Sequence, residues 1–122
     1  MILGNLYREK GQVGKAITVH QALLQRSRLS KLEHAYVLLC LGLDYKRGGF
    51  VDRAHEAFTE VLRLDSKNEY ALMNLQKLQE EQHQWREAYD TRLRLTKLAA
   101  GDAQPQSQSI LAFLENEIGL EA

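Results

Sequence analysis

Apolar residues recur at every third or fourth position along most of the chain, the spacing that places them on one face of a helix. Within residues 35–64 this spacing predicts two consecutive helices, and it predicts another over residues 107–119. The apolar stripe of that last helix consists of Ile110, Leu111, Leu114 and Ile118. Between residues 99 and 107 the pattern is interrupted by Gly, Asp and Pro, which are typical of a loop. The sequence therefore predicts an all-α chain of amphipathic helices.

The helical pattern also repeats itself at a nearly fixed distance. Leu3, Gly4, Tyr7, Gly11 and Ala16 return 38 residues later as Leu41, Gly42, Tyr45, Gly49 and Ala54. Ala54 returns 34 residues later as Ala88. A period of 34 residues is that of the tetratricopeptide repeat, in which each repeat is a pair of antiparallel helices that stacks on the next.

The repeated residues have the sizes that packed helix pairs need. We expect Gly42 and Ala54 to lie where the two helices of a repeat touch, because helix axes approach closely only where side chains are small. Tyr45 and Phe58 are expected to fill the space beside this contact. Gly49 falls in the turn between the helices, where a residue with positive φ is expected.

These features predict a single domain over residues 1–122, folded as a right-handed tetratricopeptide solenoid of about three repeats with a C-terminal capping helix. The predicted parts are repeat one (1–30, incomplete at its start), a longer connector (28–31), repeat two (35–68), repeat three (69–100) and the capping helix (107–119). We expect the capping helix to cover the open end of the stack.

Repeat three is the weakest match to the pattern. Gln76 stands in place of the small residue, Gln79 in place of the tyrosine and Arg92 in place of the aromatic residue. Its second half keeps an apolar helical face that begins at Trp85. At the end of repeat two, Asp65 or Ser66 is expected to cap the first helix of repeat three.

The amino-acid composition indicates in which cellular compartment the protein is expected and which classes of partner it disfavours. Acidic and basic residues balance at 16 each, so no net charge exists to attract nucleic acid or an anionic membrane. Cys40 is the single cysteine, which leaves no internal disulfide and fits a reducing compartment. No run approaches the roughly 18 apolar residues that span a bilayer. We expect a cytoplasmic chain that neither binds nucleic acid nor inserts into a membrane.

No group of residues has a catalytic spacing. The four histidines, His20, His34, His55 and His83, include no pair at the i, i+4 spacing of a helix-borne metal site. Cys40 has no histidine or second cysteine at ligand or catalytic spacing, so we expect a small buried filler. His20 is expected to pack or to form a hydrogen bond inside its repeat. The sequence therefore predicts a protein that is not an enzyme and that holds no cofactor or metal.

A binding surface is expected where the first helices of stacked repeats line a concave groove. The predicted groove residues are Asn5, Arg8, Tyr36, Leu39, Leu43, Lys46, Arg47, Tyr70, Met73, Asn74 and Lys77. We expect this groove to bind a peptide or helix of another protein that carries apolar and acidic residues. Tyr36 and Tyr70 are the predicted contact anchors, and the four basic groups are expected to orient the partner. Packing between neighbouring helices is the alternative role for Leu39, Leu43 and Met73.

Two other roles stay open beside this scaffold or adaptor role. The chain can act as a structural self-association module, a homo-oligomer formed through the groove or through an open end of the solenoid. A co-chaperone that clamps a C-terminal carboxylate would need Lys, Asn and Lys or Arg at set groove positions. Those positions hold Met1, Asn5, Cys40, Tyr70 and Asn74, of which only Asn5 fits. The clamp is the less favoured alternative.

Two blocks of the sequence resemble one bacterial family in particular. Residues 3–24 look like the repeat region of the lipopolysaccharide assembly protein B family, as does the block with Asp44, Tyr45, Gly49, Ala54 and Phe58. Members of that family are similar in having an N-terminal membrane anchor, cytoplasmic repeats and a C-terminal rubredoxin-like metal ribbon. They act as adaptors that regulate lipopolysaccharide synthesis through a membrane protease.

The resemblance implies an adaptor role for this chain in the regulation of lipopolysaccharide synthesis, with a parent protein anchored to the inner membrane. The 122 residues contain neither the anchor nor the paired cysteines of the ribbon. We therefore expect an excised repeat fragment or a shortened relative.

Ala54 offers a test of the repeat assignment. Replacement by leucine (Ala54→Leu) should lower the free energy of unfolding by about 1–3 kcal/mol, because the larger side chain overpacks the contact between two helices. Urea unfolding measures the change, and an unchanged midpoint would contradict the assignment.

Overall fold

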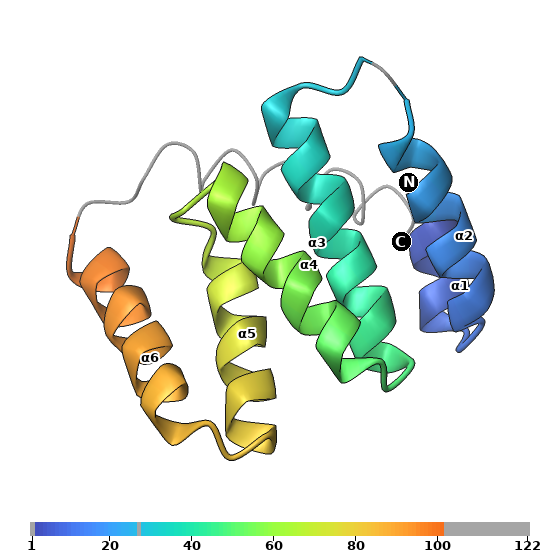
Figure 1. The fold of residues 1–122 in the computed structure, drawn as a ribbon. Coiled ribbons are helices and arrows are strands. Elements are labelled where there is room, and N and C mark those ends of the chain that lie inside the picture. The colour runs from blue at the N-terminus through green and yellow to red at the C-terminus, as the bar shows by residue number, and fades with distance from the viewer. Residues whose placement is uncertain (1, 27, 102–122) are drawn as a thin grey trace.

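The computed structural model describes residues 2–26 and 28–101, and every regular element in these ranges is an α-helix (Figure 1). The helices are α1 (Ile2–Glu9), α2 (Val13–Leu24), α3 (Lys31–Arg47), α4 (Val51–Leu64), α5 (Glu69–Glu81) and α6 (Trp85–Ala100). The all-α prediction is confirmed for these residues. The predicted capping helix, residues 107–119, lies outside the described residues.

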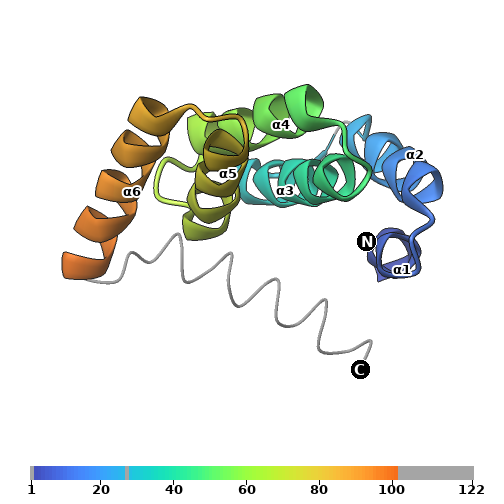
Figure 2. The same ribbon diagram turned by 90° about the horizontal axis from the view of Figure 1, so that it is seen from below.

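Consecutive helices pair as hairpins, α1 with α2, α3 with α4 and α5 with α6. The hairpins lie side by side, because α2 also packs on α3 and α4 also packs on α5 (Figure 1). Figure 2 shows α1 and α3 on one side of this layer and α2 and α4 on the other. The arrangement is compatible with the predicted helical-repeat solenoid.

The three turns inside the hairpins have the same geometry. Gly11, Gly49 and His83 occupy equivalent places in them, with φ angles of 79°, 80° and 59°. In each turn the next residue donates its backbone N–H to a carbonyl five residues earlier, over 2.8 Å in all three. This bond satisfies an otherwise unpaired carbonyl at the end of the first helix. The prediction of positive φ at Gly49 is confirmed, and the third hairpin shares this turn geometry despite its weaker sequence match.

The small residues lie at the helix contacts, as predicted. A Cβ atom added at Gly42 would lie 2.5 Å from a ring carbon of Phe58, so only glycine allows α3 and α4 to approach this closely. Ala54 is fully buried in the same hairpin. In the first hairpin a Cβ at Gly4 would collide with the imidazole of His20, which holds the place that Phe58 holds in the second.

The caps differ from the prediction at one position. Asn68, not Asp65 or Ser66, caps α5, because its side chain accepts the Ala71 backbone N–H over 2.9 Å. α4 continues to Leu64, so Asp65 instead forms the C-cap of that helix. Burial raises the pKa of the Asp65 carboxyl group.

The connector between the first two hairpins also differs from the prediction. Residues 28–31 were expected to form it, whereas α3 already begins at Lys31. A capping box starts this helix, in which Ser30 accepts the Glu33 backbone N–H and the Glu33 carboxylate accepts that of Ser30. α3 has 17 residues and α5 has 13, so the four extra residues of the first repeat offset lengthen α3 by about one turn.

Gly42 and Gly14 form a matched pair for testing this packing. Gly42→Ala should lower the free energy of unfolding by about 1–3 kcal/mol, because the methyl group forces the Phe58 ring away. Gly14→Ala should raise it by about 0.5–1 kcal/mol, since Gly14 lies inside α2 with open space around its Cα. Denaturant unfolding of both variants measures the difference, and equal effects would contradict the close contact at Gly42.

Candidate functional site

All eleven predicted groove residues lie on the first helices of the hairpins, α1, α3 and α5. Tyr70 is 37% exposed and Met73 is 47% exposed. Arg47 and Lys77 are exposed as well. Partly buried residues complete the accessible set, namely Arg8, Leu43, Lys46 and Asn74.

The other three predicted groove residues, Asn5, Tyr36 and Leu39, are buried in the structure. Their exposed fractions are 1%, 0% and 0%, so Tyr36 offers no surface for the anchoring role predicted for it. Every residue from Ala35 to Gly42 is buried, because α3 packs on α1 and α2 of the preceding hairpin as well as on α4. A helix covered on several sides presents little of its apolar surface to a partner.

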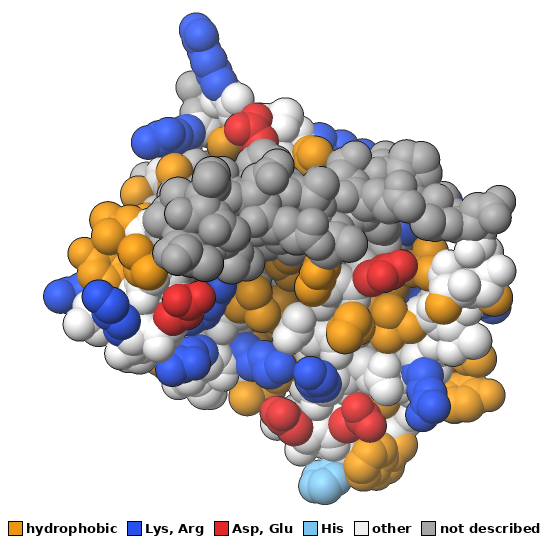
Figure 3. Space-filling view, turned by 180° about the vertical axis from the view of Figure 1, so that it is seen from behind, with side chains coloured by type: hydrophobic (Ala, Val, Ile, Leu, Met, Phe, Trp, Pro, Cys, Tyr) orange, Lys and Arg blue, Asp and Glu red, His pale blue; other side chains and the backbone are white. Residues whose placement is uncertain are grey.

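Five accessible residues of α3 and α5 are together called the basic face: Leu43, Lys46, Tyr70, Met73 and Lys77. Lys46 Nζ donates to Asn74 Oδ1 over 3.0 Å, and the Asn74 side-chain amide donates to the Tyr70 carbonyl over 2.9 Å. Figure 3 shows Lys and Arg side chains beside hydrophobic ones on this side of the molecule, with Asp and Glu side chains among them.

The electrostatics of the basic face favour an anionic partner. Burial lowers the pKa of Lys46, and the positive charge of Lys77 lowers it further. The carboxylate of Glu81 acts in the opposite direction but does not cancel these effects. A negative group bound beside the two ammonium groups would therefore relieve their repulsion.

Arg8, the remaining predicted groove cation, is held in a buried polar cluster. Its Nη1 atom lies 3.0 Å from Asp44 Oδ1 and 3.3 Å from the Cys40 carbonyl oxygen. On the other side of Asp44, His20 Nδ1 lies 2.5 Å from Oδ2. Since a carboxylate only accepts, Nδ1 carries the proton of this hydrogen bond. The cluster joins α1, α2 and α3, and the charge of Arg8 is compensated within the protein.

Periodicity alone did not identify this cluster. His20 was expected to pack or to form a hydrogen bond inside its own repeat. It does pack on Gly4 of that repeat, but its hydrogen-bond partner Asp44 belongs to the second hairpin. The available signal was an acidic residue close to a continuous apolar run that ends at Leu43. Such a charge is retained in a buried position only when it is paired.

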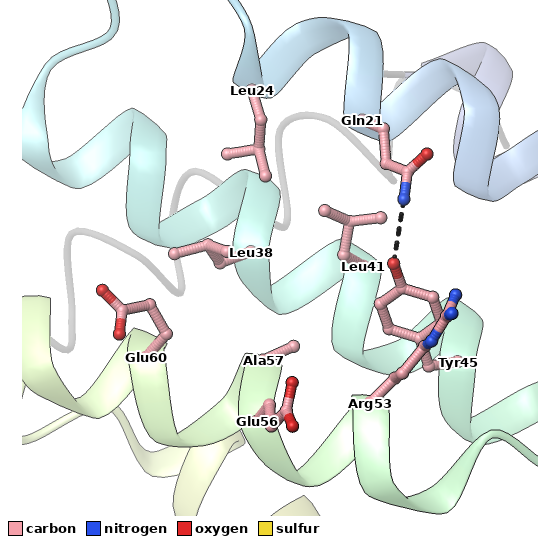
Figure 4. Close-up of a pocket in the computed structure, with 9 residues that line it drawn as sticks. All are labelled: Gln21, Leu24, Leu38, Leu41, Tyr45, Arg53, Glu56, Ala57 and Glu60. Atoms are coloured by element: carbon pink, nitrogen blue, oxygen red, sulfur yellow. Dashed lines mark hydrogen bonds between the residues drawn. The ribbon is translucent and has the colours of Figure 1, made fainter.

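A pocket of about 520 Å³ lies between α2, α3 and α4 (Figure 4). Leu24, Leu38, Leu41 and Ala57 form its apolar part. Gln21, Tyr45, Arg53, Glu56 and Glu60 supply the polar part. Gln21 Nε2 donates to the Tyr45 hydroxyl over 3.0 Å and so links α2 to α3 at one edge. No feature of the sequence pattern predicted this pocket.

No group of three or more His, Cys, Asp or Glu side chains in residues 2–26 and 28–101 has a geometry that could hold a metal ion. Cys40 is buried as predicted, and burial raises the pKa of its thiol to about 12.

α3 is the longest described helix at 17 residues, and within the described part of the chain no helix is both long and apolar enough to cross a bilayer.

The rate at which the Cys40 thiol is alkylated tests whether the polar cluster is intact. Alkylation of its thiol at pH 8 should be at least tenfold slower in the folded protein than in urea, because the raised pKa and burial leave almost no accessible thiolate. Arg8→Ala should accelerate labelling and lower the free energy of unfolding by on the order of 2 kcal/mol, because Asp44 loses a buried partner.

Arg63→Ala is the matched control for Arg8→Ala. Arg63 pairs with Glu60 on the exposed surface of α4, where solvent screens the pair, so its loss should change the free energy of unfolding far less than the loss of Arg8 does. Native labelling as fast as labelling in urea would contradict the burial of Cys40.

Comparison with known proteins identifies homologues over most of the chain, although no family model matches it. The chain is 33% identical over 98 residues to lipopolysaccharide assembly protein B of Escherichia coli, a match that covers 80% of this chain and 25% of that protein. Lipopolysaccharide assembly protein B of Haemophilus influenzae is 27% identical over 110 residues, which cover 90% of this chain and 26% of the relative. The chain thus spans about a quarter of the length of these relatives. It is a homologue of lipopolysaccharide assembly protein B.

Proposed function

We propose that this chain is a tetratricopeptide-type protein-binding module that serves as an adaptor in lipopolysaccharide assembly. Its homology to lipopolysaccharide assembly protein B supports a role in lipopolysaccharide assembly. The shared turn geometry of the three hairpins supports the repeat type. Binding without catalysis fits a chain whose accessible polar residues form a charged surface and whose only thiol is buried.

The basic face is the proposed binding surface, and its partner is an apolar and acidic segment of another protein. The observation that carries this proposal is the proximity of Lys46 and Lys77 beside the exposed side chains of Tyr70 and Met73. Tyr70 and Met73 supply apolar contact area that a helix or an extended peptide can cover. The two lysines then select acidic residues at the edge of that contact.

The proposed binding surface contains fewer residues than the groove predicted from the sequence. Tyr70 remains as an anchor, and Met73 replaces the buried Tyr36. Arg8 is excluded because Asp44 compensates its charge. Arg47 is exposed and donates to the Glu9 carbonyl over 3.4 Å, so it extends the basic face toward α1.

Two peptide pools test the proposal by fluorescence anisotropy. Both pools have the same apolar positions, with either glutamate or lysine at the remaining ones. The acidic pool should bind more tightly to the full chain, and Lys46→Glu or Lys77→Glu should weaken its binding about 3–10-fold and flatten its salt dependence. Tyr70→Ala and Met73→Ala should weaken binding at every salt concentration.

Arg26→Glu is the control, because Arg26 is an exposed cation in the connector between α2 and α3. It should leave the affinity for the acidic pool unchanged within about twofold. Equal binding of the two pools, or affinity that survives all four substitutions on α3 and α5, would exclude the basic face as the binding surface.

A further inference from the structure

Large apolar side chains are exposed on the first and the last of the described helices, α1 and α6. Leu3, Leu41 and Leu75 hold the same place on α1, α3 and α5. Leu41 is 3% exposed and Leu75 is 6% exposed, whereas Leu3 is 52% exposed. α3 and α5 each pack on the preceding hairpin, and no described helix precedes α1.

The opposite end of the stack exposes an apolar stripe on α6. Trp85, Tyr89 and Leu93 follow one another at four-residue spacing, which places them on one side of the helix. Their exposed fractions are 60%, 62% and 40%. Large apolar side chains exposed together in this way commonly mark a surface that binds another protein.

The equivalent residues of α2 show what this side of a second helix contacts. They are Val13, Ile17 and Gln21, and each of them contacts the next hairpin. Val13 lies against Gly48 at the end of α3, since a Cβ atom at Gly48 would be 2.9 Å from Val13 Cγ1. Ile17 packs on the core cluster that begins at Ala35, and Gln21 donates to the Tyr45 hydroxyl. The stripe on α6 is therefore the side that would receive a following hairpin.

We propose that α6 of one copy of this chain packs on α1 of a second copy, so that the contact between α2 and α3 is reproduced between molecules. The two exposed ends are the two halves of one contact that the stack already makes internally. This head-to-tail mode needs no new geometry, and it does not use the basic face.

The internal contacts specify the pairs across this interface. Gly48 is equivalent to Lys10, so Trp85 of one copy lies beside Lys10 of the other, where an ammonium group can pack on the indole. Tyr45 is equivalent to Tyr7, so Leu93 lies beside the Tyr7 ring. A head-to-tail contact leaves one free end at each side, so association continues beyond the dimer as concentration rises.

Sedimentation velocity of the full chain over a wide concentration range tests the proposal. Trp85 is the only tryptophan, so its emission should shift to shorter wavelength as the oligomers form. Tyr89→Glu and Leu3→Glu should each raise the dissociation constant at least about tenfold, because each places a charge in one half of the contact. Both residues are more than half exposed, so circular dichroism of the variants should remain helical.

A mixture of the two variants distinguishes head-to-tail packing from other modes. Each variant keeps one intact end, so an equimolar mixture should form a one-to-one dimer and no larger species. Met73→Glu is the matched control, because Met73 is 47% exposed but lies away from both ends, and it should leave association unchanged. Acidic-peptide binding should survive Tyr89→Glu and Leu3→Glu, which separates this proposal from the one for the basic face.

Three results would overturn the proposal. The first is a chain that stays monomeric at every concentration, with Trp85 emission that does not change. The second is association that Tyr89→Glu abolishes and Leu3→Glu leaves intact, which would indicate contact between two α6 helices. The third is a mixture of the variants that remains monomeric.

Discussion

The carboxylate of Asp44 is fully buried, and the alignment of the first two hairpins depends on how its charge is compensated. Both compensating groups come from the first hairpin, Arg8 from α1 and His20 from α2. A buried carboxylate is tolerated only while its partners stay in place, because an unpaired charge in the interior is strongly destabilising. Asp44 therefore fixes the first hairpin against α3, and α3 in turn carries Lys46 toward α5 and the basic face.

The sequence predicted the features that local chemistry determines. Helical stripes, the turn at Gly49 and the contact at Gly42 follow from side-chain size and backbone freedom, which repeat with the sequence. The third turn shows the limit of reading single residues, since His83 adopts the left-handed φ that glycine adopts in the other two. Its place in the repeat, and not its residue type, determines its conformation.

Features that depend on neighbours distant in sequence could not be predicted in the same way. Tyr36 was placed in the groove because a repeat pattern assigns sides to a helix without counting how many helices cover it. The pairing of His20 with Asp44 joins residues 24 positions apart, and periodicity contains no information on such a partner. The cap of α5, Asn68, was not predicted, because no strong stop signal in the sequence marks the end of α4. The sequence thus predicted which helices carry the candidate site, but only some of the residues that form it.

Contacts in this structure run almost entirely between helices that are adjacent along the chain. Such a stack behaves as a one-dimensional array, in which each hairpin is stabilised by its immediate neighbours and the ends can open before the middle. The hydrogen bond between Lys46 and Asn74 is one of the side-chain links from the second hairpin to the third. A ligand lying across that link would couple the two hairpins, so that amide protons far from the binding surface exchange more slowly and the whole array unfolds as a single cooperative unit.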